Sequence, residues 1–432
     1  MRETYKRRPE KGTILSNVMM RAGALAFTLW GSLTIAALLV CPYTSRADDP
    51  LPAKGTPGTV GVWRLWRRPE QPKTAILFTV LSDTRLLVAG GEPVRAGSAA
   101  TPVAAHIFDP RSGIWSMAGP PAANRDEHAA VALPSGDALL VGGVDPSKFE
   151  PVRHRHSHSY EPPKLSAAML ASTELWDPAL GWRNAGAMLE PRARPRAVLL
   201  KDGRVLVTGG IQYTYGPDYV TPTILMGGRS RVLASAEIWF PREERWLAAA
   251  PMAQARYCHT ATTLDDGRVL VVGGAPAETT RARLTVPSEI WDPVTSRWTV
   301  VSRPPRDLVG HAATLLRDGR VLITGGQAPT RGAGTRLAAA EVWDLQTGRW
   351  MNVAPMTFAR ADHDAVLLPD GRVLVAGGGG PTAEIWDPVA DRWTATGPFT
   401  DHPDDSVRLA RLPDGKVLLF GMKVQVWSPA AQ

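Results

Sequence analysis

The sequence has few cysteines and few aromatic residues, and both shortages narrow the class of protein. Its two cysteines, Cys41 and Cys258, exclude a disulfide-dense scaffold, so the fold must hold together by packing. Phenylalanine, tyrosine and tryptophan make up 7% of the 432 residues, but 15 of these side chains are tryptophan. Tryptophan has a large apolar body and a single donor, so it suits repeated packing between layers.

Motifs of the common enzyme classes are also absent from the sequence. We find no nucleophile paired with a base, no glycine-rich loop that would cradle a phosphate, and no paired carboxylates typical of a hydrolase. The glycine run from Gly377 to Gly380 extends a repeated Gly-Gly pair instead. The sequence therefore favours a noncatalytic protein without a cofactor.

The formal net charge of +8 is concentrated near the N-terminus. Residues 1–47 contain seven Lys or Arg and two Glu, which leaves +5 in this segment and +3 for the other residues. A nucleic-acid-binding domain is expected to carry its basic surface on the folded part of the chain. The sequence therefore predicts no nucleic-acid partner.

Residues 1–47 have the pattern of an export signal. A basic stretch precedes an uncharged hydrophobic stretch over 22–44, and small residues follow at Ser45 and Ala47, where a signal peptidase prefers them. The hydrophobic stretch is also long enough to span a membrane, so an uncleaved signal anchor is the alternative. We expect an exported protein that is periplasmic, extracellular or anchored to the cytoplasmic membrane, with a linker over 48–57.

Gly-Gly pairs divide the remaining chain into similar units. The first residues of the pairs are Gly90, Gly142, Gly209, Gly273, Gly325 and Gly377, with Gly421 in a degenerate seventh copy. The intervals run from 44 to 67 residues, and a period near 50 with strand-like segments is typical of propeller blades. Each unit predicts four strands, a to d, as in 311–316, 320–324, 340–343 and a last strand from 349. The Asp318-Gly319 dipeptide is a hairpin signal between strands a and b.

Tryptophans mark the hairpin of strands c and d. The two aromatic residues of each unit are seven residues apart, or six in one unit. Residues at this spacing can face each other on one side of an antiparallel hairpin, so we expect each pair to form part of the packing face of one blade. The aromatic pairs are Phe108 with Trp115, Trp176 with Trp182, Trp239 with Trp246, Trp291 with Trp298, Trp343 with Trp350, and Trp386 with Trp393. Next to each of the last three pairs stand an aspartate and an arginine, as in Asp292 and Arg297, and we expect these opposite charges to help fix the register.

The seventh unit lacks a fourth strand of its own. It ends after a strand that contains Trp427, and the spacing of the repeat places the missing strand at 60–65 around Trp63. We therefore predict an all-β fold over 58–432. It is a seven-bladed propeller of four-stranded antiparallel blades, closed by an N-terminal strand that joins the C-terminal blade. Closure of this kind removes exposed sheet edges.

The repeat resembles the Kelch repeat. The shared features are Gly-Gly after strand b, a Glu and an aromatic residue on strand c, the tryptophan of strand d, and a basic residue before a histidine that starts strand a. The chain departs from the usual pattern because tryptophan stands on strand c where tyrosine is common. It is similar to bacterial Kelch proteins and to the propeller domain of galactose oxidase. This resemblance implies a Kelch-type propeller, more often a binding scaffold than an enzyme.

The loops of unequal length are predicted to lie on one face of the propeller. From the first glycine to the strand c aromatic residue there are 18, 34, 30, 18, 18, 9 and 6 residues in successive units, while the other spacings hold constant. Strand direction places these b-to-c loops beside the d-to-a loops. Variable loops on a rigid frame commonly bind partners. We therefore expect function at this face, where the long loops run over 144–172 and 211–235.

Basic residues and histidines recur where strand a begins. A ring of such cations and imidazoles would suit an anionic ligand, because arginine can hold a carboxylate bidentately. The alternative is a structural role in which these side chains cap backbone carbonyls between blades. The members are Lys73, Arg125, Arg192, Arg256 and Arg360, with His128, His259, His311 and His363.

Two further motifs suggest metals. His154, His156 and His158 alternate in the long loop of the second unit, and in an extended chain they would lie on one side, where imidazoles could bind zinc or copper. The alternative is a polar loop without a metal. The triplet from Tyr257 to His259 invites comparison with the copper site of galactose oxidase, but the matching set of two tyrosines and two histidines is not visible.

These observations give three hypotheses for function. The leading one is an exported, noncatalytic, monomeric propeller that binds a protein or a glycan through its loop face. The second is a sugar-active enzyme, similar to the Kelch mutarotases that act on acidic sugars, with the arginines and histidines of the ring as ligand and proton-transfer groups. The third is a copper oxidase of the galactose oxidase type.

Overall fold

The computed structural model of the chain describes residues 61–65, 78–90, 95–96, 99–100, 103–148, 168–213, 230–276, 286–328, 335–401, 407–421 and 423–429. The export signal predicted over 1–47 and the linker predicted over 48–57 lie outside these residues. None of the helical segments within the described residues is long and apolar enough to cross a membrane.

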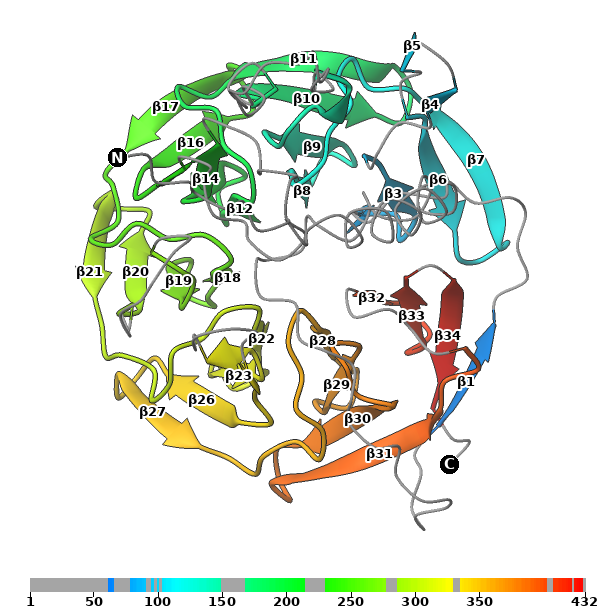
Figure 1. Cartoon of the computed structure of the whole chain (residues 1–432), viewed down its shortest axis with the longest axis vertical. Helices are drawn as coiled ribbons and strands as arrows, with labels where there is room; N and C mark the ends of the chain where they lie inside the picture. The colour runs from blue at the N-terminus through cyan, green and yellow to red at the C-terminus, as the bar shows by residue number, and fades with distance from the viewer. Residues whose placement is uncertain are drawn as a thin grey trace, which may run out of the picture. The chain divides into compact units, whose positions relative to one another are not determined.

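Seven four-stranded antiparallel sheets form a ring, each with strand a innermost and strand d outermost (Figure 1). Blade 1 contains β2 (Phe78–Val80), β3 (Leu86–Val88), β6 (Ala105–Asp109) and β7 (Ile114–Gly119). Blade 2 contains β8 (Ala129–Ala132), β9 (Ala138–Val141), β10 (Ser172–Asp177) and β11 (Gly181–Ala187). Blade 3 contains β12 (Arg196–Leu199), β13 (Val205–Thr208), β16 (Ala236–Phe240) and β17 (Arg245–Ala249). Blade 4 contains β18 (Thr260–Thr263), β19 (Val269–Val272), β20 (Glu289–Asp292) and β21 (Arg297–Val300).

The remaining three blades repeat this order and confirm the predicted fold. Blade 5 contains β22 (Ala312–Leu315), β23 (Val321–Thr324), β26 (Ala340–Asp344) and β27 (Arg349–Asn352). Blade 6 contains β28 (Asp364–Leu367), β29 (Val373–Ala376), β30 (Thr382–Asp387) and β31 (Arg392–Pro398). Blade 7 contains β32 (Arg408–Arg411), β33 (Val417–Phe420), β34 (Val424–Ser428) and β1 (Val62–Leu65). Short elements in the b-to-c loops are β4 (Arg95–Ala96), β5 (Ala99–Ala100), the 3₁₀ helix η1 (Pro146–Lys148), β14 (Ile211–Tyr213), β15 (Ser230–Val232), β24 (Gln327–Ala328) and β25 (Thr335–Arg336).

The hydrophobic core lies between adjacent blades. Side chains alternate across each strand, so one set packs against the preceding blade and the other set against the following blade. Leu270 and Ile290 of blade 4 share a cluster with Val321, Ile323 and Trp343 of blade 5. Because the same arrangement recurs around the ring, no blade buries its apolar surface alone.

The aromatic pairs of strands c and d are in the predicted register. On strand c, Trp291 and Trp343 are 0% and 1% exposed. Each strand c residue lies directly opposite its strand d partner, in the pairs Phe108 with Trp115, Trp176 with Trp182, Trp239 with Trp246, Trp291 with Trp298, Trp343 with Trp350, and Trp386 with Trp393.

The strand d tryptophans are less buried than their strand c partners. Trp246 is 6% exposed, but the other five are only half-buried, namely Trp115, Trp182, Trp298, Trp350 and Trp393. Strand d is the outermost strand, so solvent reaches one side of these side chains, and the indole N–H needs an acceptor outside its own sheet.

The acceptors of these indoles lie in or next to the preceding blade. The N–H of Trp182 donates to the Gly119 carbonyl and that of Trp246 to Thr173 Oγ1, both at 3.1 Å. The same bond recurs from Trp298 to Ala250, from Trp350 to Ser302 and from Trp393 to Ala354, at 2.7 to 3.0 Å. Each of these tryptophans therefore joins its blade to the blade before it.

Trp115 reaches its neighbour through apolar contact. Its ring centroid is 4.8 Å from that of Phe108, the partner across the hairpin. Both rings pack on a cluster that contains Leu418 and Val426 of blade 7. Blade 1 is therefore joined to blade 7 at the position where the other blades use an indole hydrogen bond.

The expected ion pair beside the tryptophans is not formed. Asp292 and Arg297 are directly opposite, as predicted, but no ion pair joins them among the described residues. The Asp292 carboxylate instead accepts the backbone N–H groups of Val294 at 2.8 Å and Thr295 at 3.3 Å. These bonds to the turn hold the pKa of Asp292 below its usual value. Because an aspartate reaches its own backbone more easily than an exposed arginine across the hairpin, turn closure replaces charge pairing.

The N-terminal strand closes the ring as predicted. Trp63 of β1 lies opposite Trp427 of β34 and is 5% exposed. Its indole donates to Thr396 Oγ1 of blade 6 at 3.0 Å, and the Thr400 hydroxyl donates to the Trp63 carbonyl at 2.8 Å. Trp63 thus takes the place that a strand d tryptophan takes in the other blades.

Candidate functional site

The d-to-a and b-to-c loops meet at one end of the blades, as the strand directions predicted. In four blades a residue of the d-to-a loop forms a β-bridge with the residue that follows the Gly-Gly pair, namely Asp126/Val144, Ala193/Ile211, Tyr257/Ala275 and Val309/Gln327. A shared apolar layer packs beneath these bridges; its members include Val144, Met169, Ile211, Tyr257 and Val309. The two kinds of loop therefore share one anchored surface, which we call the loop face.

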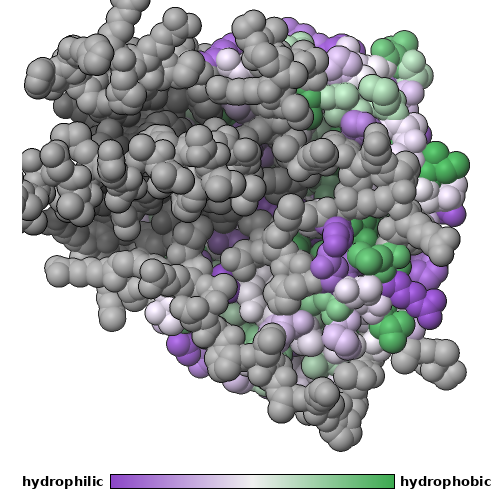
Figure 2. All heavy atoms as spheres, turned by 45° about the vertical axis from the view of Figure 1, so that its right-hand side comes forward, coloured by the Kyte–Doolittle hydropathy of each residue, from purple (hydrophilic) through white to green (hydrophobic). Residues whose placement is uncertain are grey.

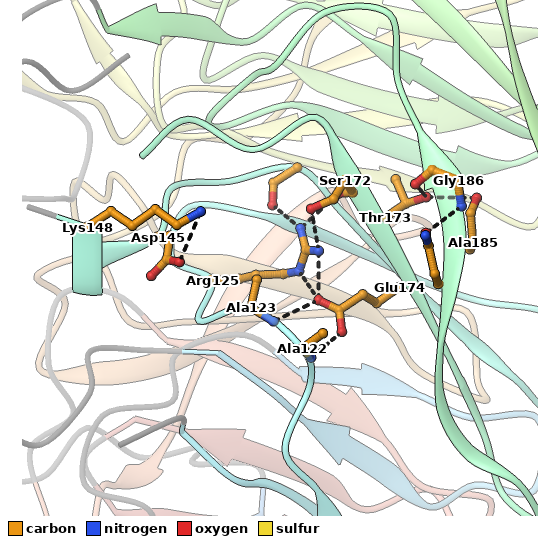
Figure 3. A network of polar contacts seen from close by, with 12 residues as sticks. Ala122, Ala123, Arg125, Asp145, Lys148, Ser172, Thr173, Glu174, Ala185 and Gly186 are labelled. Atoms are coloured by element: carbon orange, nitrogen blue, oxygen red, sulfur yellow. Dashed lines mark hydrogen bonds and ion pairs between the residues drawn. The ribbon is translucent and has the colours of Figure 1, made fainter. Parts of the chain in front are cut away.

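Four of the predicted ring arginines are buried inside the blades. Arg125 is 1% exposed and pairs with Glu174 of β10, with Nη2 to Oε1 at 2.7 Å (Figure 3). Its Nη1 donates to the carbonyl of Gly142, the first glycine of its blade, at 2.9 Å. The same glutamate and glycine partners recur in three more blades, as Arg192/Glu237/Gly209, Arg256/Glu289/Gly273 and Arg360/Glu384/Gly377.

The glutamate of each network also holds the d-to-a loop. In blade 2 the Glu174 carboxylate accepts backbone N–H groups of Ala122 and Ala123 (Figure 3). Glu237, Glu289 and Glu384 accept the corresponding N–H groups in their blades. The network therefore sets where each d-to-a loop passes before strand a begins.

The predicted histidines lie between blades. His259 Nε2 is 2.8 Å from Thr208 Oγ1 of the preceding blade, and His311 and His363 make the same contact with Thr260 and Thr324. Their side chains are between 0% and 5% exposed. Burial, and then Arg360, lower the pKa of His363 to about 3, and burial and Arg196 lower the pKa of His311 to about 3. These imidazoles are neutral at physiological pH.

The ligand role predicted for Arg125, Arg192, Arg256, Arg360 and the four histidines stays a prediction. The guanidinium groups are held by glutamates and carbonyls, and Nε2 of three of the histidines contacts a threonine hydroxyl, so a ligand would have to displace these partners. Lys73 and the loop histidines His154, His156 and His158 lie outside the described residues. Within the described part of the chain, no three His, Cys, Asp or Glu side chains come together as a metal site.

The triplet that resembles the copper site of galactose oxidase is packed into the fold. Tyr257 is 1% exposed, Cys258 7% and His259 0%. The first two belong to the apolar layer of the loop face, and the His259 ring contacts Thr208. These three residues therefore do not present a set of copper ligands to a common open position.

Charged side chains that the repeat does not predict gather where strand a begins. Residues just before the strand start have positive φ in five successive blades, and these residues are Glu127, Arg194, Cys258, Gly310 and Asp362. The Arg194 N–H donates to the Glu127 carbonyl at 2.8 Å, and the Asp362 N–H donates to the Gly310 carbonyl at 2.7 Å. These bonds link successive blades around the inner end of the loop face.

We define the axial cluster as Glu127, Arg194, Arg196, Asp362, Asp364 and Arg408. Arg194 pairs with Glu127, with Nε to Oε1 at 2.7 Å, and the Tyr213 hydroxyl donates to Glu127 Oε2 at 3.1 Å. Burial raises the pKa of Asp362 to about 6, although arginines that include Arg408 and Arg194 oppose the rise. A carboxyl group with such a pKa can exchange a proton near neutral pH.

Sequence reasoning missed the axial cluster because it followed the positions that repeat. The charged residues stand directly before and after the repeated residue that starts strand a. At the same two positions blade 5 has the small residues Gly310 and Ala312. The available signal was therefore a departure from the repeat on the innermost strands. Blade 3 has two arginines at these positions, Arg194 and Arg196, whereas blade 6 has two aspartates, Asp362 and Asp364.

Comparisons with protein families and with curated proteins find similarity to the same type of repeat, the Kelch repeat. The Kelch motif matches residues 310–357, which contain the four strands of blade 5. The Kelch-like protein terF of Aspergillus terreus is 28% identical over 40% of this chain and 36% of its own length. Human Kelch-like protein 34 is 32% identical over 32% of this chain and 21% of its own length. Human Kelch-like protein 23 is 24% identical over 48% of this chain and 41% of its own length. The matches thus span less than half of each relative.

A solved structure supports the fold across most of the chain. A fungal alcohol oxidase of the AA5 family, determined in complex with copper, superimposes with a TM-score of 0.62. The match covers 86% of this chain and 76% of the oxidase chain at 17% identity. At this identity the likeness extends to the arrangement of blades and not to the chemistry of the site.

Proposed function

We propose that this chain, a Kelch-repeat β-propeller by motif and by fold, is an exported scaffold that binds a protein partner through its loop face. The observation that carries the proposal is the contrast between the two ends of the blades. The a-to-b turns keep one length and the c-to-d turns differ by at most one residue, whereas the b-to-c connections vary from 6 to 34 residues between the same two landmarks. Kelch propellers commonly serve as protein-interaction scaffolds, and such variation on a rigid frame is typical of partner binding.

The anchors of the two long loops support this proposal. Val144 and Met169 flank the first variable segment and are 3% and 8% exposed, while Ile211 and Leu233 flank the second and are 0% and 1% exposed. β14 and β15 pair antiparallel at the base of the second loop. The chain therefore enters and leaves both segments at fixed points, which lowers the entropy that a bound loop would lose.

The described surface mixes apolar and polar residues. On the side of the molecule that Figure 2 shows, the described surface intersperses hydrophobic residues with hydrophilic ones. Exposed apolar side chains such as Leu180, Val294 and Val389 lie in c-to-d turns of three separate blades, at the end opposite the loop face. These side chains are therefore not part of the proposed interface, which rests on the variable loops and their anchors.

Deleting the variable segments tests the scaffold. Removal of 149–167 and of 214–229, each replaced by a short Gly-Ser linker, leaves the buried anchors in place. Capture of envelope proteins by the full-length chain is measured by quantitative mass spectrometry, and we expect each deletion to lose partners that the intact protein enriches. The matched control changes the opposite face, by Arg268→Ser and Arg320→Ser in two a-to-b turns. Unchanged capture by both deletions, or equal loss in the turn variant, would contradict the proposal.

A glycan is the alternative partner, and export is a separate part of the proposal. Probing a glycan array with the same preparation distinguishes the partners, because binding that the loop deletions abolish would assign a glycan to the loop face. Cell fractionation, with sequencing of the mature N-terminus, tests whether the segment 1–47 is removed or retained as an anchor. The enzyme hypotheses are not carried further, because the arginines and histidines that they would use pack within and between the blades.

A further inference from the structure

Two arginines of the axial cluster reach the central channel from distant blades. Arg196 begins β12 in blade 3 and Arg408 begins β32 in blade 7, which are three blades apart one way around the ring and four the other. Strand a is the innermost strand of each blade (Figure 1). Arg196 is nevertheless exposed. An exposed residue on the innermost strand lines the channel, so Arg196 and Arg408, at matching strand starts, stand on separate walls of it.

Within the described residues, most donors of these two arginines have no protein partner. Arg196 Nε donates to the His259 carbonyl at 2.6 Å, and Arg408 Nη1 donates to the Val407 carbonyl at 2.9 Å. Across the same part of the chain, neither guanidinium has a carboxylate within ion-pair distance. This distinguishes them from Arg125, Arg194 and the other buried arginines, each of which holds a glutamate.

The two positive charges act on each other. Desolvation, and then the charge of Arg408, lower the pKa of Arg196 to about 10, although Asp364 and Asp362 oppose the change. Neither guanidinium is held by a carboxylate, so an anion that accepts from both would engage donors that the described residues leave free. The fork of each guanidinium matches the two oxygens of a carboxylate.

The neighbouring aspartates limit the charge of the anion. Asp364 already accepts the N–H groups of Leu409 at 2.8 Å and Ala365 at 2.9 Å, so its carboxylate is held by backbone. The Asp362 side chain makes no hydrogen bond or ion pair with another described residue. Two arginines beside two carboxyl groups leave little excess positive charge, so a singly charged anion fits better than a dianion such as phosphate.

We propose that Arg196 and Arg408 form an axial site for a small monocarboxylate, whose oxygens accept from both guanidiniums while Asp362 faces it as an opposing charge. The site is built by the frame of the propeller and is independent of the variable segments that the scaffold uses. It is also distinct from the Arg-Glu networks, whose donors are engaged. The geometry assigns binding to these residues, with no reaction attached.

Acetate titrated into the full-length chain in chloride-free buffer at pH 7.5 tests the site, with broadening of its methyl NMR signal as the readout. We expect saturable broadening, at least about tenfold weaker binding in Arg196→Gln and in Arg408→Gln, and tighter binding in Asp362→Asn. The changes in opposite directions separate ligand contact from damage to the fold, which would weaken binding in every variant. Arg196→Lys, which keeps the charge and loses the fork, should fall between wild type and Arg196→Gln.

The matched control is Arg411→Gln, because Arg411 lies on the same strand as Arg408, is exposed and makes no ion pair with a described residue. It should bind acetate as the wild type does. Absence of saturable broadening would overturn the site, as would equal affinity of the wild type with Arg196→Gln and Arg408→Gln. Tighter binding of inorganic phosphate than of acetate, measured by competition in the same assay, would overturn the assignment to a monocarboxylate.

Discussion

Individual histidines at the starts of the inner strands couple the blades to pH. His128, His311 and His363 each have a pKa lowered to about 3, and burial is the first cause in all three. The unfolded chain binds a proton at each of these residues below about pH 6.5, whereas the folded chain stays neutral down to about pH 3. Folding stability therefore falls as the pH is lowered through this window.

Acidification should destabilise the propeller, and His363→Gln should reduce the effect. Each buried neutral histidine costs on the order of 2 kcal/mol at pH 5 relative to pH 7. Glutamine keeps a polar group near Thr324 but does not titrate. We expect the dependence of unfolding free energy on pH between 4 and 6 to fall by about 1.4 kcal/mol per pH unit, measured by urea denaturation. An unchanged slope in His363→Gln, with Arg411→Gln as the control, would contradict this.

Asp362, which precedes His363, should change the dependence of stability on pH in the opposite direction. Burial raises the pKa of Asp362 to about 6, so the folded state holds a proton that the unfolded state has released. The stability contributed by this proton is present below about pH 4 and is lost as the pH rises to about 6. Asp362→Asn should therefore make stability rise more steeply with pH in this window than in the wild type. A slope equal to the wild type would show that the carboxyl group has no raised pKa.

Within a blade, the strand c acid and the arginine before strand a work as a unit. Blade 5 breaks this unit because Leu308 replaces the arginine, and its Glu341 is left with the exposed Arg306, at 3.3 Å. Burial raises the pKa of Glu341 and the charge of Arg306 does not offset it. In blade 7 a buried glutamine, Gln425, holds the d-to-a loop by accepting the Thr400 N–H at 2.9 Å, so a neutral amide can do the structural part of the work.

The two kinds of glutamate should respond differently to the same substitution. Glu289→Gln leaves Arg256 buried without its counter-charge, and we expect a loss of about 3–5 kcal/mol in unfolding free energy. Glu341→Gln removes a charge that no buried arginine balances, so stability should stay the same or increase. Unfolding in urea at pH 7.5 measures both. Equal losses would show that the carboxylate is needed for the loop contact itself and not for the ion pair.

At the scale of the whole molecule, ring closure depends on one short strand. β1 supplies the outer edge of blade 7 and contacts blade 6 through Trp63 and Thr396. Without it, β34 would be an exposed edge with unpaired backbone groups. The ends of the described chain are thus joined by a strand pair rather than by a covalent bond.

Trp63→Ala should lower the unfolding free energy by about 3–5 kcal/mol, because a buried indole and its hydrogen bond to blade 6 are lost. Deleting 61–65 should go further and expose the edge of β34, which would appear as concentration-dependent association in light scattering. Met117→Ala, at a 71% exposed position on the outer strand of blade 1, is the control and should change neither property. A deletion variant that stays monomeric and as stable as the wild type would exclude closure by β1.

The sequence by itself determined the number of blades, the register of the tryptophan pairs and the closing strand, because these depend on spacings that a repeated hairpin fixes locally. Only the tertiary structure decided which neighbour each strand d indole binds and where the charges go. The ring arginines turn inward to glutamates 24 to 49 residues away, Asp292 binds its own turn, and the charge of Arg408 in blade 7 acts on Arg196 in blade 3. Charged side chains interact with the groups that the closed ring brings near them, and the spacing of residues along the chain does not reveal which groups of distant blades these are.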